Sequence, residues 1–352
     1  MKRKIILTIG LLAVGVAGWW MIRSDRAPSV ELSKTQSAAN SQPSDGGAKA
    51  LPASAGNSST QAASGATQAM LPTSVDAKRT EVAAVLEELK KQYGYAGALG
   101  WDDAKALIAK REKATKALED RLAALGAGGA AAISSAYSLT SEMRDKLLLI
   151  HALGRINDNQ AASALQGLLA SETSYSLQRE MVVALSRRTD NASTDALAAM
   201  MNQTLSTQSD SQLRFAVAQA LGGRASALST MSERIPLESS VDVQKELVRS
   251  VGAIGSEAAM RALAGFAQSS MDVSIREAAI QQMSRKFGEK ALALLDRFLS
   301  DPNELIRQNT VMAVAQIKGG ASTALLERVA SSDASSVVRE SAQTALASIG
   351  VR

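Results

Sequence analysis

Side chains that commonly perform chemistry are scarce in this sequence. Its 352 residues include one histidine, His151, and no cysteine. A single histidine without cysteine cannot assemble a typical zinc site, and it excludes an iron site that needs several histidines. Asp102 and Asp103 form the most visible pair of carboxylates, and the N-terminus of a helix explains that pair better than acid–base catalysis does. We therefore expect no metal site.

The sequence also lacks the short motifs of nucleophilic catalysis and nucleotide binding. It contains no Gly-x-Ser-x-Gly elbow, no Walker loop and no dinucleotide fingerprint. The absence of cysteine further excludes disulfides and thiolate ligands. We expect neither a cofactor nor enzymatic activity.

The net charge of +5 would at first suggest a nucleic-acid-binding protein. Much of this excess lies in residues 1–26, which carry Lys2, Arg3, Lys4, Arg23 and Arg26 against Asp25. The remaining chain has little net charge and so lacks a general phosphate-binding surface. Nucleic-acid binding, as in helical-repeat DNA glycosylases, is therefore only an alternative prediction.

The N-terminus predicts a membrane anchor at residues 5–22, behind a cytoplasmic tail at residues 1–4. The segment "IILTIGLLAVGVAGWWMI" contains no charge, and as a helix it would span about 27 Å, close to the thickness of a hydrocarbon core. The bases before it place the N-terminus in the cytoplasm and the body on the periplasmic or extracellular side. A cleaved signal peptide with "VAG" at its end is the competing interpretation.

Residues 23–76 are rich in Ser, Ala, Gly, Gln and Pro and contain few large apolar residues. Such a segment cannot bury enough surface to offset its chain entropy, so we expect a disordered linker. It would give the body reach from the membrane.

Beyond the linker, one helical phrase recurs about every 32 residues. Its closing apolar residue, called the anchor here, is Leu153, Leu185, Leu221, Val251, Met283, Val314 and Leu346 in turn. Further apolar residues stand four and eight positions before most anchors, which is the spacing of one helix face. A second helical segment precedes each phrase, as in residues 257–268, 289–300 and 322–331.

This pattern predicts an all-α fold, an α-solenoid of about seven helical hairpins over residues 127–352. One hairpin cannot bury both of its apolar faces, whereas stacked neighbours can. The small residue after each anchor would let adjacent inner helices approach closely. Residues 77–126 predict two N-terminal capping helices, at 77–92 and 102–125, with Asp102 as an N-cap.

The phrases at residues 301–317 and 333–350 resemble those of HEAT and HEAT-like repeats, including the type found in phycobilisome lyases. Both phrases place an acid six residues before an arginine, Asp301 with Arg307 and Asp333 with Arg339. The resemblance implies that these residues form a ladder between neighbouring repeats. Arg214 and Arg276 would contribute to the same ladder, although neither has an acid at that spacing.

The positions six before, two before and two after the anchor share one helix face. In a HEAT-like stack this face lines a concave groove. Its predicted binding residues are Arg155, Arg179, Arg187, Gln219, Lys245, Arg249, Gln281, Arg285 and Gln316. Because arginines suit carboxylates through forked hydrogen bonds, the groove would accept an acidic or polar segment of another protein.

These features together favour a membrane-tethered scaffold that binds a partner protein outside the cytoplasm, as a chaperone or assembly factor for an exported protein. The alternative from the resemblance is a bilin lyase-like enzyme. His151, two positions before an anchor, is expected on the exposed side of its helix as a surface polar residue.

Overall fold

The computed structural model describes residues 74–94, 101–203 and 211–350. These residues are helical, and no strand occurs among them. With the exception of Trp101 they belong to one compact unit, Pro72–Ala96 with Asp102–Arg352. The predicted cytoplasmic tail at residues 1–4, the predicted membrane-spanning segment at residues 5–22 and most of the predicted linker lie outside the described residues. Within the described residues, no helix has the length and apolar character needed to cross a bilayer.

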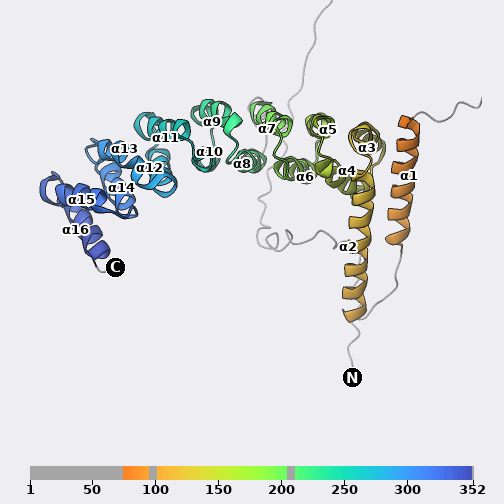
Figure 1. Ribbon diagram of the computed structural model, residues 1–352, viewed down its shortest axis with the longest axis horizontal. Coiled ribbons are helices and arrows are strands. Elements are labelled where there is room, and N and C mark those ends of the chain that lie inside the picture. The colour runs from red at the N-terminus through yellow and green to blue at the C-terminus, as the bar shows by residue number, and fades with distance from the viewer. Residues whose placement is uncertain (1–73, 95–100, 204–210, 351–352) are drawn as a thin grey trace, which may run out of the picture. The chain divides into compact units, whose positions relative to one another are not determined.

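From α3 onward the helices alternate between two layers (Figure 1). The outer layer contains α3 (Ala127–Leu139), α5 (Asn159–Ser171), α7 (Asn191–Gln203), α9 (Leu228–Arg234), α11 (Glu257–Ser269), α13 (Leu292–Phe298) and α15 (Gly320–Ser332). The inner layer contains α4 (Met143–Arg155), α6 (Tyr175–Ser186), α8 (Ser211–Ala220), α10 (Val241–Ala253), α12 (Val273–Phe287), α14 (Glu304–Ala315) and α16 (Ser336–Gly350). The two helices before them, α1 (Ser74–Gln92) and α2 (Trp101–Ala123), run in a different direction at the N-terminal end, where α1 packs against α3 (Figure 1).

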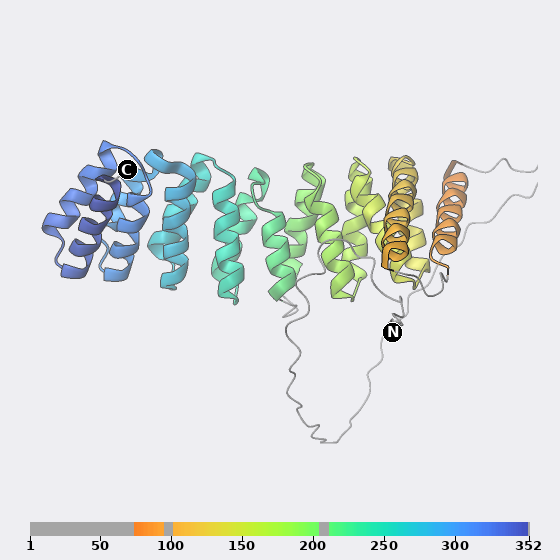
Figure 2. The ribbon, with the colours of Figure 1, turned by 90° about the horizontal axis from the view of Figure 1, so that it is seen from below.

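From α3 onward, each odd-numbered helix forms an antiparallel hairpin with the next even-numbered one, and neighbouring hairpins stack side by side (Figure 2). Along the inner layer, α4 packs against α6, α6 against α8, and so on to α14 against α16. The predicted all-α stack of hairpins is therefore present, with α1 and α2 ahead of the seven repeats.

The anchors form the centre of the continuous core. From Leu153 to Val314 the exposure of every anchor is 0%, and the residues four positions before them are equally buried. Thr310 occupies such a core position because its hydroxyl donates to the carbonyl of Ile306 at 2.7 Å. Burying the aliphatic side chain of one anchor stabilises the fold by about 1.5–3 kcal/mol. Leu346, in the last hairpin, is only half-buried because no described repeat covers it.

Small residues after the anchors allow the inner helices to approach each other. A Cβ atom added to Gly154 would lie 2.9 Å from the Cβ of Ala184 in the next repeat. Ser284, after its anchor, fits between the helices by hydrogen-bonding to the backbone carbonyl of Ala313 in the next repeat, and Ser250, just before its anchor, does the same to that of Ala218 in the preceding repeat. The predicted close approach is therefore visible in the packing of the inner layer.

Several predicted boundaries are wrong. Helix α1 begins at Ser74, three residues before the predicted start and within the predicted linker. Helix α2 begins at Trp101, so Asp102 lies in its first turn and is not its N-cap. The segment predicted as one helix at residues 289–300 consists of the 3₁₀ turn η4 (Gly288–Ala291) followed by α13, and Gly288 ends α12 with a φ of 54°. Two further 3₁₀ turns, η2 (Ala225–Ala227) and η3 (Ile235–Leu237), flank the short α9.

Candidate partner-binding surface

The inner helices present one solvent-facing surface, called the inner-helix surface here. All nine predicted binding residues lie on it and are exposed or half-buried: Arg155, Arg179, Arg187, Gln219, Lys245, Arg249, Gln281, Arg285 and Gln316. Seven of them lie on α4, α6, α8, α10 and α12, and the other two, Arg187 and Gln316, immediately follow α6 and α14. The apolar side chains on the opposite face of each helix hold them in this position.

Some basic side chains of this surface form ion pairs with acidic residues of the chain, and others do not. Arg179 lies 3.7 Å from Glu180, and Arg249 lies 2.7 Å from Glu246, each on its own helix. Within the described residues, Arg187, Lys245 and Arg285 form no ion pair. These three cations lie on α10 and at the C-terminal ends of α6 and α12, and they are available to an acidic ligand.

At the N-terminal end of the surface, His151 of α4 connects this helix to α2 and to α6. Its Nδ1 lies 3.0 Å from a carboxylate oxygen of Glu119 on α2, and its Nε2 lies 3.4 Å from one of Glu180 on α6. Hydrogen bonds to Glu119 and Glu180 raise the pKa of His151 to about 9. The imidazole is therefore charged at neutral pH. His151 is half-buried on the solvent-facing side of its helix, outside the core as expected, and the structure adds its two carboxylate partners, which the sequence did not indicate.

Arg155 belongs to the same cluster. Its guanidinium contacts the carboxylate of Asp120 and lies 3.6 Å from that of Glu119. Among the predicted binding residues it is thus the one most committed to partners within the chain. We assign Arg155 and His151 to the attachment of α2 to the repeats, and not to ligand binding.

The predicted ladder residues lie along the turns between outer and inner helices. Arg307 donates from Nε to Asp333 at 2.9 Å and from Nη2 to the other carboxylate oxygen at 3.2 Å. Arg276 contacts the carboxylate of Asp301 in the next repeat. The spacing of six residues between acid and arginine corresponds to a contact within one repeat. Arg307 and Arg339 donate to the backbone carbonyls of Asp301 and Asp333, respectively.

The ladder extends further toward the N-terminus than the sequence indicates. Lys146 lies 3.2 Å from Glu172 of the following repeat, and Tyr137 also donates to that carboxylate. Burial alone would raise the pKa of Glu172, but hydrogen bonds from Tyr137, the Ser174 N–H and Lys146 lower it to about 2. Lys146 stands seven positions before its anchor, as Arg276 and Arg307 do, and this register could have identified it.

A buried charge cluster around Glu238 was not predicted. Arg214 donates to both of its carboxylate oxygens, at 2.9 and 3.0 Å. The side chain of Arg234 is 1% exposed and lies 3.7 Å from Glu238, without a hydrogen bond to any of its guanidinium nitrogens. Burial lowers the pKa of Arg234. No sequence signal marked Arg234, because its burial depends on the short α9 that precedes η3.

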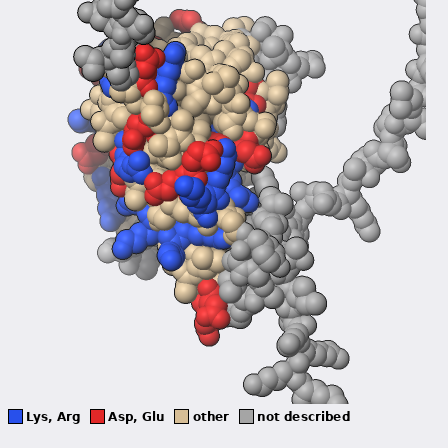
Figure 3. All heavy atoms as spheres, turned by 90° about the vertical axis from the view of Figure 1, so that its right-hand side faces the viewer, with Lys and Arg blue, Asp and Glu red and all other residues tan. Residues whose placement is uncertain are grey.

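The N-terminal end of the unit mixes charges of both signs (Figure 3). Arg121 on α2, for example, lies 2.7 Å from Glu81 and 2.6 Å from Glu88 on α1. Such interleaved charges do not provide the continuous basic surface that a nucleic-acid backbone needs.

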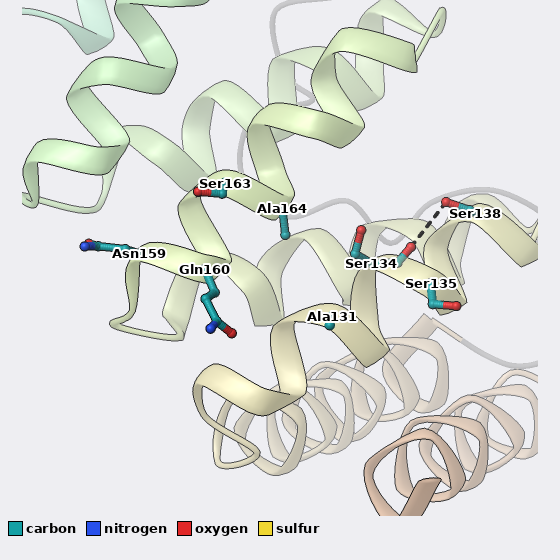
Figure 4. Close-up of a pocket in the computed structure, with 8 residues that line it drawn as sticks. All are labelled: Ala131, Ser134, Ser135, Ser138, Asn159, Gln160, Ser163 and Ala164. Atoms are coloured by element: carbon teal, nitrogen blue, oxygen red, sulfur yellow. Dashed lines mark hydrogen bonds between the residues drawn. The ribbon is translucent and has the colours of Figure 1, made fainter. Parts of the chain in front are cut away.

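The outer layer contains a cleft of about 700 Å³ between α3 and α5 (Figure 4). It is lined by Ala131, Ser134, Ser135, Ser138, Asn159, Gln160, Ser163 and Ala164. None of these side chains titrates near neutral pH. In the part of the chain that the structure describes, no three His, Asp or Glu side chains are grouped so that they could hold a metal ion.

Comparison with known proteins identifies the repeat type. Residues 266–347 match a family model described as HEAT repeats. No curated protein matches the chain. Taken with the stacked hairpins, the match shows that the chain contains HEAT-like repeats.

Solved structures with a similar arrangement are distant. Human deoxyhypusine hydroxylase is 19% identical, with 78% of this chain and 98% of that chain covered and a TM-score of 0.32. The YibA protein of Escherichia coli is 12% identical, with 82% and 99% covered and a TM-score of 0.40. The CpcE–CpcF phycocyanin lyase complex of Nostoc sp. PCC7120 is 18% identical, with 61% and 93% covered and a TM-score of 0.31.

Proposed function

We propose that this protein is a HEAT-like scaffold that binds an acidic segment of a partner protein along its inner-helix surface. The observation that carries the proposal is the set of bases without an ion pair on that surface, Arg187, Lys245 and Arg285. Forked or multiple hydrogen bonds from such groups suit carboxylates. A solenoid also offers a long surface on which one segment can contact several repeats in turn.

The polar residues of the same surface support this assignment. Gln219, Gln281 and Gln316 lie on α8, on α12 and at the C-cap of α14, and their side chains can donate to and accept from an extended backbone. The basic side chains of this surface favour a negatively charged ligand, and the glutamine amides between them can hydrogen-bond to the backbone of segments with many different sequences. The ligand we propose is therefore a flexible acidic segment, whose sequence is constrained mainly in its charge.

The N-terminal sequence extends the proposal to location. We propose that the segment at residues 5–22 tethers the protein to the cytoplasmic membrane with the repeats on its outer side, where the scaffold serves an exported or envelope protein as a chaperone or assembly factor. Tethering raises the local concentration of the scaffold for partners near the membrane. Carbonate extraction of membranes from cells expressing the full chain tests whether residues 5–22 span the membrane. A protein without this membrane-spanning segment would be released into the supernatant.

A defined acidic peptide tests the binding surface. The full chain is titrated with a fluorescent peptide of about 20 residues rich in Asp and Glu, and binding is followed by anisotropy at several salt concentrations. Reversing the charge at Arg187, Lys245 and Arg285 to Glu should weaken binding at least about tenfold, a change of about 1.4 kcal/mol.

The matched control reverses three exposed bases of the outer layer, Arg261, Lys290 and Arg297. It changes the net charge by the same amount and should leave the affinity nearly unchanged. Equal losses in both variants would show that only overall charge matters, and the inner-helix surface would then not be the binding site.

A further inference from the structure

The exposed apolar side chains of the described residues gather at one edge of the repeat stack. Nine large apolar residues are exposed, and only Val75 and Met312 lie elsewhere. The other seven are Leu139, Met143, Leu237, Val241, Met271, Leu305 and Val337. All seven lie in the turns from an outer to an inner helix or in the adjoining helix ends, a region called the turn edge here.

The fold explains why these residues share an edge. Because every hairpin has the same direction, all inner helices of the repeats begin on the same side of the stack (Figure 2). Met143 and Val241 stand ten positions before their anchors, and Leu305 and Val337 stand nine positions before theirs. Adjacent helices pack about 8–10 Å apart, so the turns form a row with about that spacing.

Folding does not account for these residues. Met271 is fully exposed and Leu139 is 85% exposed, so neither contributes to the core. Most turn residues of such repeats are polar, and single exposed apolar residues would be scattered over both edges and both layers. Their concentration on one edge is the kind of distribution that marks an interaction surface.

The exposed charges beside these apolar residues are mostly negative, although Arg339 donates to the backbone carbonyls of Asp333 and Ala334 in the last turn. Exposed acids stand beside the apolar residues at the start of four inner helices: Glu142, Asp242, Asp272 and Glu304. The ladder acids Glu172, Glu238, Asp301 and Asp333 are already paired with ladder bases. Arg144, the exposed base in these turns, lies over the ring of Tyr93. A ligand of this edge must therefore present positive charge next to apolar groups.

We propose that the turn edge is a second docking surface, which binds a basic amphipathic helix of a partner protein. Such a helix advances about 10.5 Å in seven residues, close to the distance between neighbouring turns. Apolar residues repeated at that interval would contact four successive turns, from the turn between α9 and α10 to the turn between α15 and α16, with Lys or Arg beside the acids. An anionic bilayer and a second copy of this edge would both be repelled by the same acids.

This second surface is independent of the acidic-segment site. The inner-helix surface carries unpaired bases, whereas the turn edge carries acids and apolar side chains. One partner with segments of opposite charge, or two partners, would engage them separately. Failure of one proposal therefore leaves the other intact.

A designed peptide pair tests the turn edge. A labelled helix of about 20 residues built from Leu and Lys, with Leu on one face, is titrated into the full chain and compared with a scrambled peptide of the same composition. The triple variant Met271→Ser, Leu305→Ser and Val337→Ser should weaken binding of the amphipathic peptide at least about tenfold. The control Val75→Ser with Met312→Ser, exposed apolar residues outside the turn edge, should not.

The acids are tested in the same assay. Asp242→Asn with Glu304→Gln should weaken binding and reduce its salt dependence, while the affinity for the acidic peptide of the inner-helix surface stays unchanged. The proposal is overturned if the full chain binds neither designed peptide, if it binds both equally, or if the control loses as much affinity. Loss of dimerisation in light scattering, or of binding to phosphatidylglycerol vesicles, in the turn-edge variant without loss of peptide binding would instead assign the edge to a second copy or a bilayer.

Discussion

The buried charge cluster around Glu238 allows us to predict how the loss of one charge changes the stability of the protein. Glu238→Gln keeps the shape of the side chain and its acceptor for the Ser240 N–H, which lies 2.9 Å away. It removes the negative charge that Arg214 contacts at 2.9 and 3.0 Å and that Arg234 approaches at 3.7 Å. The guanidinium group of Arg234, 1% exposed, then loses the one carboxylate that forms an ion pair with it within 4 Å among the described residues, and Arg214 loses its two hydrogen bonds to a charged acceptor.

Leaving a buried charge unpaired costs about 3–5 kcal/mol. If the unit unfolds cooperatively, this corresponds to a fall in melting temperature of at least about 6 °C. Because repeat proteins can open one part at a time, hydrogen exchange of α8, α9 and α10 should be followed together with chemical denaturation. We expect the loss of protection to be centred on these helices.

The same cluster supplies an opposite prediction. Arg234→Met should be neutral or stabilising, because this guanidinium is buried without a hydrogen bond and a thioether fills similar space. In the Glu238→Gln background it should restore at least about 1 kcal/mol, which a double-mutant cycle measures. Glu327→Gln, at an exposed acid of α15, is the control and should change stability by less than about 0.5 kcal/mol. A small effect of Glu238→Gln together with a large loss from Arg234→Met would refute the argument.

Three further changes test the packing and the ion pairs. Since carboxylates raise the pKa of His151 to about 9, its stabilisation of about 1–3 kcal/mol should be fully present below pH 6.5 and lost as the pH rises through 9, and denaturation of His151→Gln across this range should lack that dependence. Gly154→Ala should lower the melting temperature because the added Cβ would lie 2.9 Å from the Cβ of Ala184 on the neighbouring helix, and Gly252→Ala should lower it less because the nearest atom there, Oε1 of Gln282, can move and the Cβ of Gln282 lies 3.2 Å away. Asp333→Asn should cost about 1–2 kcal/mol in chemical denaturation by breaking a forked ladder pair, and Arg339→Gln, which has no acid partner in the described part of the chain, should cost less.

The sequence predicted the repeat because the core depends on a periodic pattern. The anchors and the residues four and eight positions before them are the side chains that stacked hairpins must bury, so their apolar character recurs with the period of the fold. Even the exceptions follow local chemistry. Thr310 is accommodated by a carbonyl of its own helix, and Asp145 is buried beside the hydroxyl of Thr140.

The ion pairs could not be predicted in the same way, because they join residues of different repeats. The resemblance implied a ladder between neighbouring repeats, but the spacing of six residues did not indicate that the carboxylate of Asp301 contacts Arg276 of the preceding repeat. His151 likewise depends on carboxylates 29 and 32 positions away. Partner selection across the stack requires the relative rotation of neighbouring hairpins, which a one-dimensional pattern does not contain.

The exposed surfaces mark the limit of sequence reasoning. The inner-helix surface could be deduced from the register of the anchors. The turn edge could not, because its apolar residues occur in turns of differing length and their exposure depends on the exact start of each inner helix. Met271 illustrates this, because it lies two residues before α12. If α12 began one turn earlier, Met271 would be part of the helix and its exposure would differ.

Photo-crosslinking in cells tests the central claim that a partner binds along the inner-helix surface. A photoreactive residue replaces Gln219, Gln281 or Gln316 on that surface, or Gln166 or Gln268 as matched exposed glutamines of the outer layer. The account predicts one partner crosslinked from the inner positions, mapped by mass spectrometry to an acidic segment, and none from the outer positions. Crosslinks that arise only from the outer positions, or that map to a basic segment, would contradict it.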